Sequence, residues 1–220
     1  MRIPAAAFAG LDVTTAQALA VQQRLHTAVV RSDRRGRIRL VAGLDLAFPE
    51  KNLAQAAAVV ISVPQLEVVE QHVVRTPVRF PYVPGLLSFR ELPALLEVLR
   101  KVSADPDVIM CDGQGIAHPR RFGLASHLGV LLDVPCIGVA KSRLVGEHAA
   151  VPDHRGGWVP LCDKGQRIGA VLRTRERVRP LFVSVGHRIS LRRARRLVLR
   201  CAPRYRLPEP TRLADKLSRV

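Results

Sequence analysis

Aromatic residues are scarce in this chain, and their scarcity restricts the kind of core that it can build. They make up 4% of the 220 residues, whereas the hydrophobic fraction as a whole is 48%. The core must therefore be aliphatic, and a chain with this much apolar material is not intrinsically disordered. A length of 220 residues suits one globular domain, so we expect residues 1–220 to form a single domain.

Cysteines and long hydrophobic runs are also in short supply. The four cysteines are far apart and form no C-x-x-C pair. This spacing is a poor match to zinc motifs or to a disulfide framework, and it favours a reducing, cytoplasmic location. No apolar run approaches the roughly 18 residues that a membrane-spanning helix needs, so we expect no membrane span.

Acidic residues are few, and the resulting positive charge is unevenly distributed. The chain has 35 basic and 18 acidic side chains, and only five of the basic ones are lysines. Residues 164–220 carry a net charge of +14, whereas residues 1–163 carry +3. A balance this basic favours a polyanionic partner, either a nucleic acid or an anionic membrane surface. The membrane is the weaker alternative, because the basic segment lacks a bulky apolar face.

Four arginines crowd one short predicted helix in the basic segment. These are Arg192, Arg193, Arg195 and Arg196. Like charges at this spacing repel one another unless an anion lies opposite them. Arginine forks match phosphate oxygens, so we expect this helix to contact a DNA backbone. The alternative is a solvated helix face in an arginine-rich protein.

The pattern of apolar residues predicts a mixed α/β fold. A helix capped by Thr14 or Thr15 runs to about Val30, followed by a buried strand over Arg39–Phe48 and a hairpin of Ala56–Pro64 with Leu66–Arg75. Helices are then expected at Ser88–Val102, Phe122–Leu132 and Ser190–Cys201, and strands at Asp107–Cys111, Cys136–Val139, Gly157–Leu161, Arg167–Arg173 and Leu181–Ser184. Strands that alternate with helices after an initial hairpin predict a mixed central sheet with helices on its faces.

Two aspartates occupy positions where a carboxylate needs a partner. Asp45 interrupts the most apolar predicted strand, and an ionised carboxylate buried there must be hydrogen-bonded, paired or bound to a cation. Asp112 follows the apolar run 108–111, at the carboxyl end of a strand, where α/β proteins place their ligands. The alternatives are an outward-facing Asp45 on a half-exposed strand and an Asp112 that only forms a turn.

Glu91 has a competing structural explanation. Ser88-Phe89-Arg90-Glu91 has the pattern of a capping box, with Ser88 as the N-cap and Glu91 at the third helical position. Local pattern alone favours capping over metal binding. Three carboxylates from separate segments can nevertheless converge on Mg²⁺, which prefers hard oxygen ligands.

The segment between residues 111 and 141 offers two further polar candidates. His118 follows a glycine-rich turn and is either a proton-transfer group, a phosphate ligand or a surface histidine. Lys141 follows a predicted strand, again at a ligand-facing edge. Gly113 and Gly115 do not complete a G-x-G-x-x-G fingerprint, so we expect no nucleotide cofactor.

A proline-stiffened loop surrounds one of the two tyrosines. Pro81 and Pro84 flank Tyr82 and Val83, and they restrict the backbone of the loop. A rigid loop with an aromatic tip can wedge between stacked bases. The alternative is a tyrosine packed against its own domain.

Four sequence blocks together resemble the endonuclease V family of deoxyinosine-specific repair nucleases. They are FPYVPGLLSFRE at 80–91, CDGQGIAHPRRFGLASHLG at 111–129, IGVAKSRL at 137–144 and RLPEPTRLAD at 206–215. The blocks occur in order and with compatible spacing, and the resemblance runs from about Val41 to Leu217.

The resemblance implies a ribonuclease H-like fold and a role for each candidate. Asp45, Glu91 and Asp112 would surround Mg²⁺, which reverses the preference for capping alone at Glu91. A further acidic position falls on Asp215, where some members carry histidine. His118 and Lys141 would lie beside the scissile phosphate. The strand-separating wedge would be Pro81, Tyr82, Val83 and Pro84, and the pocket for the extruded base would be formed around Gly85, Leu87, Gly113 and Leu124.

The implied activity is metal-dependent hydrolysis of the second phosphodiester bond 3′ to a deaminated base, leaving 3′-hydroxyl and 5′-phosphate ends. We expect Mg²⁺ as the cofactor, with Mn²⁺ able to substitute, deoxyinosine-containing DNA as the partner, and a monomeric protein. Two alternatives remain open: the same chemistry on inosine-containing RNA, and a non-catalytic nucleic-acid-binding module on the same scaffold.

Overall fold

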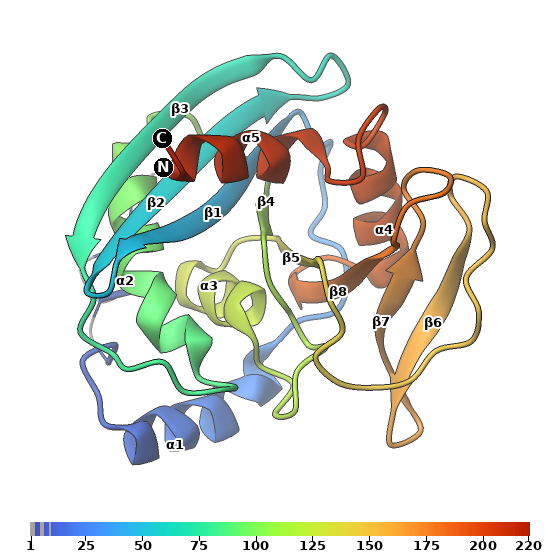
Figure 1. Cartoon of the computed structure of the whole chain (residues 1–220). Helices are drawn as coiled ribbons and strands as arrows, with labels where there is room; N and C mark the ends of the chain where they lie inside the picture. The colour runs from blue at the N-terminus through green and yellow to red at the C-terminus, as the bar shows by residue number, and fades with distance from the viewer. Residues whose placement is uncertain (1–2, 5–6, 9) are drawn as a thin grey trace.

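The computed structural model of the chain describes residues 3–4, 7–8 and 10–220. Eight strands form a sheet in the order β3-β2-β1-β4-β5-β8-β7-β6 (Figure 1). The strands are β1 (Leu40–Glu50), β2 (Leu53–Ser62), β3 (Val68–Pro77), β4 (Val108–Cys111), β5 (Cys136–Ala140), β6 (Trp158–Asp163), β7 (Gln166–Leu172) and β8 (Leu181–His187).

Helices cover both faces of this sheet. They are α1 (Thr15–Leu25), α2 (Leu87–Lys101), α3 (Leu124–Leu132), α4 (Leu191–Arg200) and α5 (Glu209–Ser218), with a short 3-10 turn, η2 (His26–Ala28), after α1. Helices α2 and α3 bury their apolar sides in one hydrophobic cluster, whereas α4 and α5 contribute to another on the opposite face. The predicted architecture, a mixed sheet flanked by helices, is confirmed.

The sheet topology brings two candidate carboxylates to one edge. β1 pairs in parallel with β4, and β4 pairs in parallel with β5, while the other neighbours are antiparallel. Parallel strands end at the same edge, so the chain after β4 and the chain after β5 emerge beside the distal part of β1. That edge holds Asp45, Asp112 and Lys141.

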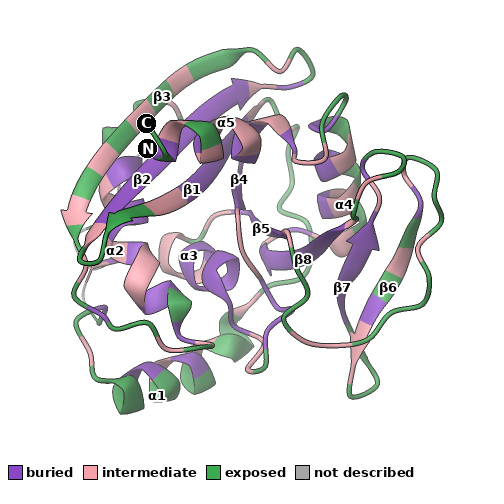
Figure 2. Ribbon diagram, in the orientation of Figure 1, coloured by how far each residue is buried: buried purple, intermediate pink, exposed green. Residues whose placement is uncertain are grey.

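The core is aliphatic, as the low aromatic content requires. The central strands are buried along most of their length, whereas the edge strand β3 alternates between exposed and partly buried residues (Figure 2). Phe89 and Phe122 are the aromatic side chains among the largest fully buried ones, and most of the rest are leucine and isoleucine. None of the helices in the described part of the chain has the length and apolarity needed to span a lipid bilayer.

The boundaries of the predicted helices lie within two residues of the prediction, except at the end of α1. Thr14 caps α1 with a capping box to Gln17, as expected, but α1 ends at Leu25 rather than near Val30. The predicted capping box in α2 is wrong: the helix begins at Leu87, and Ser88 lies inside it. The Ser88 hydroxyl instead contacts His127 Nδ1 at 3.1 Å, so Glu91 is free of a capping role.

Helix α5 was not predicted, because prolines at 208 and 210 make the segment look irregular. Proline is tolerated in the first turn of a helix, where its missing N–H has no intrahelical acceptor. The helix lies close against β1 (Figure 1). A Cβ on Gly43 would lie 2.1 Å from the carbonyl carbon of Pro210, so only glycine permits this contact. This docking brings Asp215 to the sheet edge.

Candidate active site

Asp45 is a buried carboxylate on β1. The residue is 8% exposed, which excludes the outward-facing alternative. Ser218 donates a hydrogen bond from Oγ to Asp45 Oδ2 at 2.6 Å. Burial raises the pKa of Asp45 to about 7, with the nearby Asp112 adding to the shift and the Ser218 hydrogen bond opposing it.

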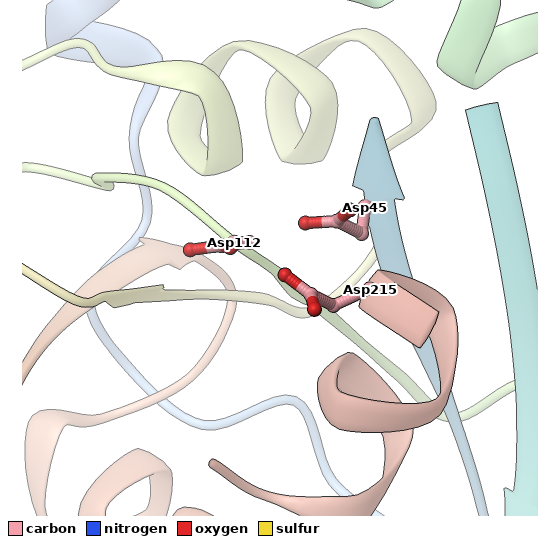
Figure 3. Close-up of side chains that lie close together, drawn as sticks. All are labelled: Asp45, Asp112 and Asp215. Atoms are coloured by element: carbon pink, nitrogen blue, oxygen red, sulfur yellow. The ribbon is translucent and has the colours of Figure 1, made fainter. Parts of the chain in front are cut away.

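Asp45, Asp112 and Asp215 form a cluster of three carboxylates. One ligand atom from each lies within 4.8 Å of the others. Figure 3 shows that the three side chains lie close together and come from β1, from the end of β4 and from α5. Helix α5 therefore completes a site whose other two members lie on adjacent parallel strands.

Lys141 lies within this cluster and bridges two of its members. Its Nζ is 2.5 Å from Asp112 Oδ2 and 2.6 Å from Asp215 Oδ1. Arg206 fixes the same segment by donating to the carbonyl oxygen of Lys141 at 2.7 Å. Burial alone would lower the pKa of Lys141, but the hydrogen bonds to both aspartates outweigh it and raise that pKa.

Asp215 is held by two cations. Besides Lys141, Arg219 donates from Nη2 to Asp215 Oδ1 at 2.9 Å. Burial would raise the pKa of Asp215, but the hydrogen bonds from Lys141 and Arg219 hold it below its ordinary value. Asp215 is therefore ionised at neutral pH and contributes a negative charge to the cluster.

Glu91 approaches the aspartates from α2, on the opposite face of the sheet from α5. Burial of its carboxyl group raises its pKa to about 8, and the charges of Asp45 and Asp112 contribute to the shift. Glu91 is not one of the three residues whose ligand atoms converge. Glu91 lies close enough to Asp45 and Asp112 to feel their charges, but outside their cluster. This position suits a carboxylate that would contact a bound cation through a water molecule.

His118 lies away from the carboxylates. Its Nε2 contacts the carbonyl oxygen of Gly85 at 3.1 Å, and its Nδ1 accepts from the Arg120 backbone N–H at 3.2 Å. Burial lowers the pKa of His118 to about 4, and the charge of Arg120 contributes. The imidazole is therefore neutral at pH 7. His118 therefore contacts the end of the proline-stiffened loop rather than the acidic cluster.

A cavity of about 150 Å³ opens beside the cluster. It is lined by most of the residues predicted for the wedge and the base pocket, namely Tyr82, Val83, Pro84, Gly85, Leu87, Gly113 and Leu124. Gly113 directly follows Asp112, so the cavity begins one residue from the carboxylates. The Tyr82 side chain is 72% exposed, which excludes the alternative of a tyrosine packed into its own domain.

Gln22 and Arg120 also belong to this cavity region, although neither was predicted. Gln22 is buried and donates from Nε2 to Gly85 O at 3.0 Å, and Arg120 donates from Nη2 to the same oxygen at 2.6 Å. Together with His118, three donors therefore surround the Gly85 carbonyl at the end of the proline-stiffened loop 81–84. Neither residue stands out in the sequence. An isolated glutamine in an amphipathic helix looks like a surface residue, and Arg120 is one arginine in an arginine-rich chain.

The four arginines predicted to contact DNA differ in their surroundings. Arg193 donates to the backbone carbonyls of Arg34 and Gly36, and the Arg195 guanidinium lies 3.6 Å from the centroid of the Trp158 ring. Arg192 and Arg196 are exposed. Arg193 and Arg195 therefore make contacts within the protein, whereas Arg192 and Arg196 are exposed to solvent.

The donor set of the cluster fits a hard divalent cation. All three converging side chains are carboxylates, and no cysteine or histidine joins them among the described residues. Mg²⁺ and Mn²⁺ prefer such oxygen ligands. Asp45 and Asp215 come from opposite ends of the sequence and are brought together only by the docking of α5.

The mixed sheet, with acidic side chains from β1, from the end of β4 and from α5 gathered at one edge, is the arrangement of a metal-dependent nuclease with the ribonuclease H-like fold. Residues 23–216 match the family model described as Endonuclease V. This chain belongs to the endonuclease V family.

Known members of the family are similar over almost the whole chain. A relative from Rippkaea orientalis, named Endonuclease V, is 53% identical over 203 residues, which cover 92% of this chain and 89% of the relative. The crystal structure of endonuclease V from Streptomyces avermitilis is 45% identical, covers 99% of this chain and 95% of that chain, and has a TM-score of 0.90.

A third structure contains nucleic acid. Endonuclease V from Ciona intestinalis, in complex with a 24mer DNA containing an inosine followed by a ribo-adenosine, is 30% identical and has a TM-score of 0.82. The similarity covers 93% of this chain and 95% of that chain. As a member of the endonuclease V family, this chain is a DNA repair endonuclease, and the nucleases of this family are metal-dependent.

Proposed function

We propose that this nuclease hydrolyses the second phosphodiester bond 3′ to deoxyinosine, and to other deaminated bases, leaving 3′-hydroxyl and 5′-phosphate ends. The observation that carries the proposal is the adjacency of two features. A cluster of three carboxylates lies one residue from a cavity bordered by an exposed aromatic loop. A nuclease that reads one base and cuts nearby needs both.

Mg²⁺ is the proposed cofactor, and Mn²⁺ would substitute for it. Asp45, Asp112 and Asp215 would hold the cation, with Glu91 held to it directly or through water. Such an ion neutralises a phosphodiester, activates water and stabilises the leaving oxygen. Hydroxide attack on a phosphodiester needs this help, because the negative charge of the phosphate repels the nucleophile.

Lys141 contributes a positive charge at the place where the phosphate must lie. Its ammonium already contacts two of the carboxylates, and Arg206 fixes its backbone. A cation preorganised in this way stabilises charge that develops on the phosphate oxygens during hydrolysis. His118 is neutral and binds Gly85, so we propose that it supports the loop and pocket beside the scissile phosphate rather than acting as a cation.

Recognition of the base would take place in the cavity. A deaminated base pairs weakly, so its extrusion from the duplex costs less than that of a normal base. Tyr82 is exposed at the rim, and the prolines on either side restrict the loop in advance. The ring can then occupy the space left in the stack, while Gly85, Leu87, Gly113 and Leu124 enclose the extruded base.

The proposal is tested with a duplex that contains one inosine and a matched duplex without it. We expect a single nick at the second phosphodiester 3′ to the inosine, with Mg²⁺ present and no nick in a chelator. Asp45→Ala and Asp112→Ala should abolish nicking and retain measurable binding to inosine DNA. Near-normal Mg²⁺-dependent nicking by either variant would remove the proposed metal site.

Inosine-containing RNA remains a second candidate substrate. The observation in its favour is that the DNA in the Ciona complex carries a ribo-adenosine after the inosine. A cut at that position would act on a ribonucleotide linkage. Cleavage rates on RNA and DNA oligonucleotides of the same sequence, each with one inosine, separate the two substrates, and we expect DNA to be cut faster.

The organisation of the chain is part of the same proposal. We propose that residues 1–220 form a single domain that acts as a monomer in the cytoplasm without a nucleotide cofactor. The four free cysteines, Cys111, Cys136, Cys162 and Cys201, are compatible with a reducing compartment. Light scattering of the purified protein, alone and with DNA, tests the oligomeric state.

A further inference from the structure

A chain of hydrogen bonds connects the edge strand β3 to the carboxylate of Asp45. Gln55 on β2 is 2% exposed and lies at its centre. Arg75 on β3 donates from Nε to Gln55 Oε1, and Gln55 donates from Nε2 to Ser218 O at 2.9 Å and to Val220 O at 2.7 Å. Ser218 then donates from Oγ to Asp45 Oδ2.

The strand register places this chain of hydrogen bonds on the side of the sheet where α5 docks. Asp45 pairs with Ala57, and Ala47 pairs with Gln55. Residues two apart on a strand share a face, so Gln55, Ala57 and Asp45 all project toward α5. The small side chain of Ala57 leaves room between the glutamine and the aspartate, and the end of α5 fills that room.

Gln55 supplies the donor that the end of α5 lacks. The last carbonyls of a helix have no intrahelical partner, and a buried end needs donors from elsewhere. The Gln55 amide fills this role for Ser218 O, while Arg75 fixes the amide orientation by binding Oε1. The close contact of Gly43 with Pro210 anchors the other end of the helix. The position of α5 along the sheet is therefore set at both ends.

Ser218 connects the end of α5 to the acidic cluster. Its hydroxyl is buried and bonds both Asp45 Oδ2 at 2.6 Å and the carbonyl oxygen of Asp215 at 3.1 Å. The one hydroxyl thus links a carboxylate on β1 to the backbone of a carboxylate residue on α5. Without it, the Asp45 carboxylate would lose its hydrogen bond to the helix that carries Asp215.

We propose that Gln55 and Ser218 are positioning residues that hold Asp45 and Asp215 in the mutual arrangement required for binding a divalent cation. The inference rests on the proposed function, because it takes these aspartates as the metal site. Groups that orient metal-binding carboxylates typically change metal affinity by about 10- to 100-fold when they are removed. Their contribution should be measurable without DNA and without catalysis.

Mn²⁺ binding to the full chain without DNA, followed by the electron paramagnetic resonance signal of free Mn²⁺, tests the proposal. We expect Ser218→Ala to weaken Mn²⁺ binding by about 10-fold or more. Ser218→Thr keeps a hydroxyl and should restore most of the affinity. The matched control is Ser126→Ala, because Ser126 is also a buried serine on a helix, but its Oγ has no hydrogen-bond partner among the described residues. It should bind Mn²⁺ as the wild type does.

Gln55→Leu tests the other half of the hydrogen-bond chain. We expect a comparable loss of Mn²⁺ affinity, and the double variant Gln55→Leu/Ser218→Ala should lose less than the product of the two single losses, since both act on one carboxylate. In cleavage assays at limiting Mg²⁺, the rate should fall and excess Mg²⁺ should restore most of it, while the KM for inosine DNA stays near the wild-type value. If Gln55→Leu does not fold, Ser218→Ala and its threonine rescue decide the question.

Asp45→Ala separates failure of this inference from failure of the proposed function. Wild-type Mn²⁺ affinity in Ser218→Ala, together with loss of binding in Asp45→Ala, would overturn the positioning role alone. Wild-type affinity in Asp45→Ala would overturn the metal site and this inference with it. A melting temperature lowered by Ser218→Ala but not by Ser126→Ala, with Mn²⁺ affinity unchanged in both, would assign Ser218 a purely structural role and contradict the proposal.

Discussion

Lys141 Nζ lies 2.6 Å from Asp215 Oδ1, across 74 positions of the sequence. The contact joins the end of β5 to α5, and it puts an ammonium among the carboxylates that we assign to a cation. Its positive charge offsets part of the repulsion among the acidic groups. In the function proposed above, the same ammonium would move from these carboxylates to a phosphate oxygen during the reaction.

Replacing Lys141 should therefore separate metal binding from hydrolysis. We expect Lys141→Met to bind Mn²⁺ at least as tightly as the wild type, because a competing cation is gone. Nicking of inosine DNA should fall by about 10²- to 10³-fold, the usual effect when one preorganised group is removed from a developing charge. Lys101→Met, at an exposed lysine on α2, is the control and should retain full activity. Nicking by Lys141→Met at close to the wild-type rate would contradict the role.

Glu91 should give the metal-free protein a pH-dependent stability. Its pKa is raised to about 8, whereas that of an exposed glutamate lies near 4. Between these values the folded state binds more protons than the unfolded state, so stability falls as pH rises through about 4 to 8. We expect Glu91→Gln and the wild type to melt at similar temperatures at about pH 4, and the variant to melt progressively higher as the pH rises to about 9.

Cation binding should reverse part of this destabilisation. Carboxylates bind a metal only after their protons leave, and Asp45, with a pKa of about 7, should release its proton in the same range. Added Mg²⁺ should therefore raise the wild-type melting temperature more at about pH 9 than at about pH 6. Thermal melts in chelator and in Mg²⁺ measure both effects. Equal stabilisation at the two pH values would count against the assigned carboxylates.

Tyr82 should govern lesion discrimination without affecting stability. The ring is mostly exposed, so Tyr82→Ala removes little buried surface and should leave the melting temperature unchanged. Removal of a stacking surface worth roughly 1–3 kcal/mol should reduce the preference for inosine duplex over normal duplex by about 5- to 150-fold. Tyr205→Ala is the control, because this second tyrosine packs under the Arg212 guanidinium instead. Unchanged discrimination in Tyr82→Ala would refute the wedge.

The arginines of α4 should divide into two classes in binding experiments. Arg192 and Arg196 are exposed, so Arg192→Gln/Arg196→Gln should flatten the slope of log affinity against log salt by about 0.9 for each phosphate that is no longer neutralised. Arg193 binds Arg34 O and Gly36 O, so Arg193→Gln should lower the melting temperature and leave the slope unchanged. A slope that responds equally to both variants would show that the division is wrong.

The strands, and the two aspartates within and after them, could be predicted from the sequence because both signals are local. Asp45 stands out within an apolar strand, and Asp112 stands out at the end of one. The local pattern alone predicts a capping role for Glu91 that the helix does not use, since α2 begins at Leu87 rather than after Ser88. A shift of two residues in the N-cap removes Ser88 and Glu91 from the positions that a capping box requires. Tertiary packing sets where the helix begins, so the local pattern cannot predict it.

Long-range partners could not be predicted in the same way. Helix α5 has two prolines near its start, and its identity as a helix depends on its docking on β1 at Gly43. Gln55 sits in an alanine-rich strand, and Ser218 lies near the other end of the sequence, 173 positions after Asp45. Only the folded chain brings these groups together, so the neighbours of the carboxylates are visible only in the structure.

The nicking reaction of the purified chain on a duplex with one inosine tests the central claim most directly. The wild type should cut the inosine strand at the second phosphodiester on the 3′ side when Mg²⁺ is present, and it should leave the matched normal duplex intact. Chelation of the metal, Asp45→Ala and Asp112→Ala should each abolish the nick. A nick at that position in chelator, or in either variant, would contradict the assignment of these carboxylates to a catalytic cation.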